Sequence, residues 1–274
     1  MDQKTLYDTI DPEIVTRVNA RHEEISRGAS VNSKLAAALA LGSIPVAHAA
    51  LTKDVYGQAP SDVLDVLQFA LLLEYLEAEF YQRGVAASGL IDSADMTIFS
   101  TISAHETAHV AALQSLISSK GGTPNAKPTF DFTAHGNVPG FSFSAGQYDT
   151  FKALAQAFED TGVRAYKGQA PRLINDKAIL TAALTIHSIE ARHASEIRRL
   201  RGLKGWITLA SRDDLPAFTQ AIYDGEDNVL QGGVDVSALS LTAANGGTAA
   251  ATQAFDEPLT KDQVTAIVVP FIAS

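Results

Sequence analysis

The stretch that decides the fold is HSIEARHASEI, residues 187–197, which contains a Glu-x-x-His pattern formed by Glu190 and His193. The same pattern occurs earlier, in HETAHVAAL, where it is formed by Glu106 and His109. Side chains three residues apart on a helix lie on one face, about a turn from each other. One copy means little, because glutamate and histidine are common on exposed helix faces. Two copies in one chain suggest a shared function.

The two copies belong to a longer internal repeat. A glutamate precedes each copy at nearly the same distance, Glu74 before the first and Glu159 before the second. A tyrosine follows each of these glutamates seven residues later, at Tyr81 and Tyr166. Seven residues are almost two helical turns, so each glutamate and its tyrosine share a face. The chain therefore contains two copies of one helical hairpin, each reading Glu…Tyr…Glu-x-x-His.

Helical periodicity and end signals predict four long helices, arranged as two hairpins. Residues 121–146 join the hairpins, are rich in glycine and proline, and show no helical period. One long crossover in a four-helix bundle is the topology of ferritin-like folds. The sequence thus predicts an all-α, ferritin-like four-helix bundle over residues 59–203, with helices at about 61–84, 94–120, 147–169 and 177–201.

The repeated residues predict a metal site. Four carboxylates inside a bundle repel one another and lose their hydration unless cations neutralise them. Two divalent ions would offset the four charges, and two neutral imidazoles would complete an oxygen-rich shell suited to iron or manganese. The chain has no cysteine, which excludes disulfides, iron–sulfur clusters and thiolate zinc sites. We expect two divalent ions, iron favoured and manganese the alternative, with these ligands: Glu74, Glu106, His109, Glu159, Glu190 and His193.

Several stretches, taken together, carry a resemblance to a known family: LEYLEAEFY, HETAHV, AFEDTGVRAYKGQA, IHSIEARHASEIRRLR, YDGEDNVLQGGVDV and AFDEPLTKDQV. The chain resembles the ferritin-like superfamily, and most closely the bacterial ferritin-like domain proteins related to plant desiccation-related proteins. The resemblance covers about residues 63–271. It implies a role for each ligand: Glu74 and Glu159 as ligands from the first and third helices, Glu106 and Glu190 as bridges between the ions, and His109 and His193 as caps of one ion each.

The same resemblance implies that Tyr81 and Tyr166 hydrogen-bond ligand carboxylates across the pseudo-twofold axis; plain core aromatics are the alternative. His187 lies three residues before Glu190, so it could be an extra ligand. Its repeat partner is Ser103, which favours a core histidine or a hydrogen-bond donor to a ligand. His105 is not expected to be a ligand.

Other acidic residues compete for these roles. Glu77 lies three residues after Glu74, near the same face, but its repeat partner is Gly162, so the repeat favours Glu74. Glu79 is expected to be a solvated charge. Asp160 points about a third of a turn away from its neighbour Glu159 and is expected at the surface or as a capping group.

The regions outside the bundle are predicted to be extensions. Residues 1–58 are expected to form a helical extension with a helix at 11–26. Within it, residues 34–50 have the length of a signal-peptide core, too short for a membrane span. An exported and a cytoplasmic protein both remain open. Residues 204–274 are expected to pack on the bundle, mostly irregular or short-stranded, with a last helix started by a capping box at Thr260 and Gln263.

The favoured function is redox chemistry at the two metal ions, oxidising Fe²⁺ or reducing O₂ or peroxide in stress protection. The alternative is a structural or assembly protein that uses the bundle as a scaffold, since ferritin-like bundles often oligomerise and extensions suit packing against other subunits. A net charge of −10 without a basic patch argues against nucleic acid as a partner.

Overall fold

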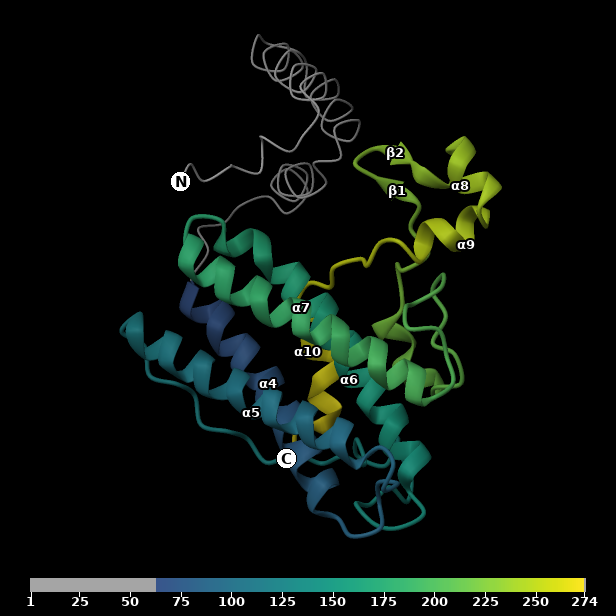
Figure 1. Cartoon of the computed structure of the whole chain (residues 1–274). Coiled ribbons are helices and arrows are strands. Elements are labelled where there is room, and N and C mark those ends of the chain that lie inside the picture. Colours follow the sequence, from purple (N-terminus) through teal and green to yellow (C-terminus); the bar gives the residue numbers. More distant parts are fainter. Residues whose placement is uncertain (1–62, 274) are drawn as a thin grey trace, which may run out of the picture. The chain divides into compact units, whose positions relative to one another are not determined.

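The computed structural model describes residues 63–273. Its centre is a bundle of four long helices, which confirms the predicted all-α ferritin-like architecture. Helices α4 and α5 pack together as one hairpin, α6 and α7 as the other, and α4 also contacts α6 (Figure 1). Their bounds are α4 Val63–Ala86, α5 Met96–Ser119, α6 Tyr148–Gln169 and α7 Lys177–Leu200.

The two hairpins each contain one enclosed and one outer helix. Helices α4 and α6 are buried over most of their circumference, whereas α5 and α7 bury a narrower stripe. The end signals of α7 act as expected, because the Asp176 side chain accepts a hydrogen bond from the Ile179 backbone N–H at its start. Gly202, with φ of 74°, follows its last turn. The polar residues of α4 and α6 therefore lie in the interior, because the buried stripes of α5 and α7 pack against these two helices.

The long crossover between α5 and α6 is fastened to the bundle by aromatic rings. Phe132 and Phe143 lie with their ring centroids 5.4 and 5.7 Å from that of Phe80 on α4. Near its middle, Phe130 forms an isolated β-bridge with Ile272 at the end of the chain. A connection of this length persists because its buried rings contribute to the core.

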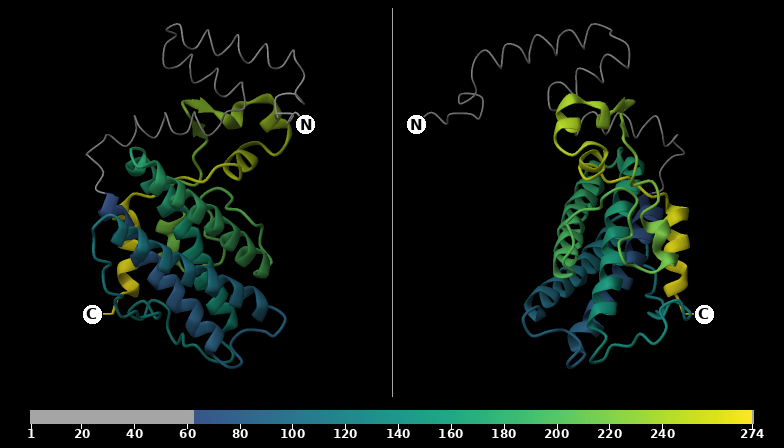
Figure 2. Two further views of the ribbon diagram at one scale, coloured as in Figure 1. Left: turned by 60° about the vertical axis from the view of Figure 1, so that its left-hand side comes forward. Right: turned by 90° about the vertical axis from the view of Figure 1, so that its right-hand side faces the viewer.

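The end of the tail packs closely on α6. The helix α10 (Lys261–Val268) begins with the predicted capping box, in which Thr260 and Gln263 exchange side-chain and backbone hydrogen bonds. Just before it, the Leu259 backbone crosses Gly168 so closely that a Cβ on the glycine would lie 1.8 Å from the Leu259 oxygen. The tail can pass there only because the position is glycine. Figure 2 shows α10 lying along one side of the bundle.

The rest of the tail is made of short elements. The short-stranded prediction holds for β1 (Leu230–Gln231) and β2 (Val234–Asp235), which pair antiparallel. It is wrong for LTAANGGTAAATQ, where the chain forms two short helices, because alanine favours helix and the Gly246–Gly247 pair, at φ 114° and 60°, separates them. The remaining elements are η2 Ala170–Leu173, η3 Ala217–Ile222, η4 Val236–Ala238, α8 Ser240–Ala244, α9 Gly247–Thr252 and η5 Val269–Phe271.

The predicted helix at 11–26 and the signal-like segment at 34–50 lie outside the described residues. Within residues 63–273, no helix combines the length and the apolar character needed to cross a membrane.

Candidate metal centre

The structure brings all six expected ligands together in the middle of the bundle. They form two overlapping groups, and within each group one ligand atom of every residue lies within 4.8 Å of the others. The first group is Glu74, Glu106, His109 and Glu190, and the second is Glu106, Glu159, Glu190 and His193. Glu106 and Glu190 belong to both groups.

The two shared carboxylates divide their oxygens between the groups. Glu106 directs Oε2 to His109 Nδ1 at 3.2 Å and Oε1 to His193 Nδ1 at 2.8 Å. Glu190 directs Oε1 to His109 Nδ1 at 3.0 Å and Oε2 to His193 Nδ1 at 3.6 Å. Each shared glutamate thus presents one oxygen to each group, which is the arrangement a carboxylate needs to bridge two ions.

The two unshared carboxylates are held by tyrosines from the opposite hairpin. Tyr81 of α4 donates to Glu159 Oε1 at 2.6 Å, and Tyr166 of α6 donates to Glu74 Oε1 at 2.5 Å. The other oxygen, Oε2, faces the histidine of its own group, at 3.2 Å for Glu74 and 3.4 Å for Glu159. The tyrosines leave one oxygen of each carboxylate free to point into the cluster.

The donor atoms are spaced as they would be around an ion. Donors about 2.1 Å from a common ion and at right angles lie about 3.0 Å from each other. The imidazole Nδ1 atoms lie 2.8 to 3.6 Å from the facing oxygens. Most buried polar atoms have hydrogen-bond partners, so unsatisfied ones need an explanation. Within residues 63–273, five atoms of the cluster are buried without a hydrogen-bond partner: Glu106 Oε1, Glu159 Oε2, both oxygens of Glu190, and His193 Nδ1. This donor set fits one divalent ion in each group.

Burial acts on the carboxyl groups in different ways. Burial, together with the charge of Glu190, holds the pKa of Glu74 well above its usual value. Burial raises the pKa of Glu159 to about 8. Burial also disfavours the charged form of Glu106, but the hydrogen bond with His109 and the nearby imidazole of His193 outweigh it and lower its pKa to about 2.

The histidines respond to the surrounding negative charge. Burial alone would lower the pKa of His109, but hydrogen bonds to Glu106 and Glu190 raise it to about 12. The pKa of His193 also rises well above its usual value, because the charge of Glu159 and the nearby carboxylates of Glu106 and Glu190 outweigh burial. Without metal, imidazolium protons therefore supply positive charge that metal ions would replace.

Glu77, the competitor of Glu74, lies outside both groups. It is nevertheless buried, at 3% exposure, and burial followed by the charge of Glu190 holds its pKa well above the usual range. The Glu77 side chain fits here because its repeat partner is a glycine: a Cβ on Gly162 would lie 3.1 Å from Glu77 Oε1. The difference between the repeats at this position therefore adds one buried carboxyl group beside the four of the cluster.

The expected surface role of Asp160 is wrong. Asp160 is buried, at 3% exposure, and accepts hydrogen bonds from Arg198 Nη2 at 3.0 Å and from the Tyr223 hydroxyl at 2.8 Å. Its partners lie far along the chain, so periodicity on α6 alone does not reveal the pairing. Glu79 is likewise more than a solvated charge, because its partly buried side chain forms ion pairs with Arg83 and Lys127.

Two further histidines on the bundle helices, His105 and His187, differ from each other. His105 was not expected near the centre as a ligand, and it lies outside both groups, but its Nδ1 lies 3.0 Å from Nε2 of His193. Its spacing of four residues from His109 is the signal that could have placed it on this side of α5. His187 also lies outside both groups, with a buried Nδ1 that has no partner, and burial lowers its pKa.

The part of the chain that contains these residues matches a known family. Residues 62–203 match the family model described as the ferritin-like domain. The match spans α4 to α7 and therefore includes all six residues of the two groups. A search of curated proteins returned no match.

Proposed function

This chain belongs to the ferritin-like domain family, and we propose that it binds two divalent metal ions in its bundle and uses them to oxidise Fe²⁺ or to reduce O₂ or peroxide. Iron is the favoured metal and manganese the alternative, because all the donors are carboxylate oxygen and imidazole nitrogen. Removal of such oxidants would protect the cell under stress. The observation that carries the proposal is the sharing of Glu106 and Glu190 between the two groups.

Each ion would be held by a different set of side chains, and the two sets share two glutamates. Glu74 and His109 would complete one position, and Glu159 and His193 the other, with the shared glutamates between them. Iron or manganese held in this way would supply electrons and bind the oxidant. The protein contributes a buried pocket of fixed negative charge, which favours cations over neutral molecules.

Metal content and Fe²⁺ oxidation test the proposal together. Purified protein supplied with Fe²⁺ or Mn²⁺ should retain two ions per chain by elemental analysis, and Fe²⁺ oxidation by peroxide or O₂ should exceed that of buffer. Glu190→Ala should abolish the excess, whereas Glu196→Ala, on the same helix but outside both groups, should leave it unchanged. Less than one ion per chain would contradict the metal site, and full activity of Glu190→Ala would contradict the enzyme.

A second candidate is the structural or assembly protein. It is favoured by large apolar side chains on the surface of the tail, where Leu230 is 60% and Leu241 76% exposed. Such a protein would retain two ions per chain yet oxidise Fe²⁺ no faster than buffer, and it would form a larger assembly by light scattering. Leu241→Ser would then reduce the assembly without changing the metal content.

A further inference from the structure

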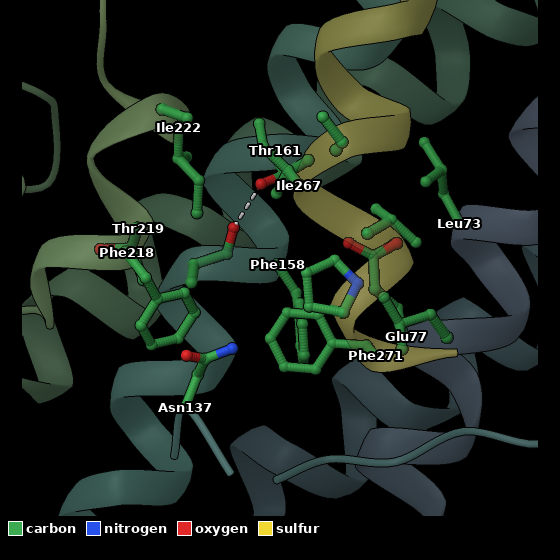
Figure 3. Close-up of a pocket in the computed structure, with 17 residues that line it drawn as sticks. Leu73, Glu77, Asn137, Phe158, Thr161, Phe218, Thr219, Ile222, Ile267 and Phe271 are labelled. Atoms are coloured by element: carbon green, nitrogen blue, oxygen red, sulfur yellow. Dashed lines mark hydrogen bonds between the residues drawn. The ribbon is translucent and has the colours of Figure 1, made fainter. Parts of the chain in front are cut away.

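A pocket of about 170 Å³ lies between α4, α6 and the C-terminal tail, beside the metal centre (Figure 3). Phe158 of α6 and Phe271 of the tail form part of its wall, with Ile222 and Ile267 above them. The tail segments that line the pocket follow residue 203, so they lie beyond the part of the chain that matches the family model. The pocket is a feature that the tail adds to the bundle.

Glu77 is the one charged residue among those that line the pocket in the described part of the chain. No hydrogen bond to its carboxyl group occurs within residues 63–273. The hydroxyls of Thr161 and Thr219 are already used, because they donate to the backbone oxygens of Ala157 and Pro216 at 2.7 Å. Glu77 therefore offers the pocket a free acceptor oxygen, whether its carboxyl group is ionised or protonated.

The pocket and the metal centre meet at Gly162, which also lines the pocket. A Cβ on this glycine would lie 3.1 Å from Glu77 Oε1 and 3.8 Å from Glu190 Oε2. The pocket's carboxyl group and the shared carboxylate of the metal centre thus approach the same point on α6. A molecule that contacts Glu77 would lie next to the metal positions.

We propose that this pocket binds one small, mostly apolar molecule with a single hydrogen-bond donor, of the size of a phenol, whose donor reaches Glu77. The size follows from the volume, since an apolar cavity of about 150 Å³ accommodates benzene. The donor follows from Glu77, because a wholly apolar ligand would displace water from the carboxyl group and leave it unpaired. This site goes beyond the proposed metal chemistry and does not require metal to be bound.

Calorimetric titration with p-cresol and toluene tests the pocket, since the two ligands differ by one hydroxyl. The full-length protein, both as purified and after loading with Mn²⁺, should bind one p-cresol per chain, and toluene at least about tenfold more weakly. Glu77→Leu should remove this preference. Ala266→Phe, which adds a ring to the wall, should abolish binding of both ligands, whereas Ala112→Phe, an exposed position outside the pocket, should leave binding unchanged.

Three results would overturn the inference: no saturable p-cresol binding, equal binding by Ala266→Phe and Ala112→Phe, or an intact p-cresol preference in Glu77→Leu. If Ala266→Phe does not fold by circular dichroism, Ala221→Phe on η3 blocks the same pocket. Binding of p-cresol is measured with and without added metal. Failure to bind Mn²⁺ would therefore contradict the proposed function but not the inferred ligand of the pocket.

Discussion

The two helical hairpins are alike where they face the candidate metal centre and differ about a third of a turn around α4 and α6 from it. Counting along the repeat, Tyr75 and Glu79 of α4 correspond to Asp160 and Arg164 of α6. On α4, these positions hold the crossover, because the Tyr75 hydroxyl donates to the Asn125 oxygen at 3.2 Å and Glu79 pairs with Lys127.

On α6, the corresponding positions hold the C-terminal tail. Asp160 accepts a hydrogen bond from Tyr223, and Arg164 Nε lies 2.8 Å from Glu226 Oε1 in a pair that is almost fully buried. The repeat is therefore preserved in the buried cluster of carboxyl groups and imidazoles. It diverged where each enclosed helix contacts a different covering segment. Four predictions test the residues that the two repeats share and those in which they differ.

The largest effect is expected at the shared carboxylates. Glu106→Ala should lose both ions, because Glu106 contributes an oxygen to each group. Glu74→Ala should lose one ion and keep the other, since Glu74 belongs to the first group alone. Elemental analysis of the two variants after loading with Mn²⁺ measures the difference. Equal losses would show that the two groups do not act as separate positions.

The divergent positions should differ strongly in stability. Arg164→Met should lower the free energy of unfolding by about 3–5 kcal/mol, because it leaves Glu226 buried and unpaired. Glu79→Gln, at the matching position of α4, should cost less than about 1 kcal/mol, because its partners are largely exposed. Urea unfolding of both variants at the same metal concentration measures the two losses of unfolding free energy. A similar loss in both would show that the contacts to the crossover and to the tail do not differ in stability.

Metal affinity should rise with pH. The pKa of His109 is about 12 and that of His193 is also raised, so both imidazoles are protonated between pH 6 and 8 when metal is absent. Each ion must displace at least its imidazolium proton, and the raised pKa values of Glu74 and Glu159 add carboxyl protons, so affinity for the pair should increase at least about a hundredfold per pH unit as pH rises and weaken as pH falls. Titration with Mn²⁺ at several pH values, with proton release measured, checks this. His135→Ala should keep the slope, and a flat profile would contradict the prediction.

The smallest effect is expected at the paired tyrosines. Tyr81→Phe and Tyr166→Phe each remove one hydrogen bond to an unshared carboxylate, so each should weaken metal binding by about 10- to 100-fold. The two losses should be similar, because the contacts correspond across the repeat. Competition with a chelator measures both affinities. A strong effect of one substitution alone would show that the hairpins are not equivalent at the centre.

Much of the candidate site could be predicted because it depends on local spacing. The Glu-x-x-His spacing and the seven-residue spacing from glutamate to tyrosine each place their residues on one face of a helix. The repeat supplies four such faces, one on each long helix, and these faces meet in the bundle. Sequence reasoning did not predict the contact of His105 with His193, and it expected Asp160 at the surface or as a capping group. Both partners, His193 and Arg198, lie on α7, far along the chain from α5 and α6.

The amino-acid sequence by itself determined the four long helices, their arrangement as two hairpins, and the face on which the repeated residues lie. These features follow from the 3.6-residue period and from end signals within a few residues of each helix end. The tertiary structure alone decided that Asp160 is buried, that Gly162 leaves room for Glu77, and that the tail closes a pocket over them. Those features depend on contacts between distant segments, which no local period encodes.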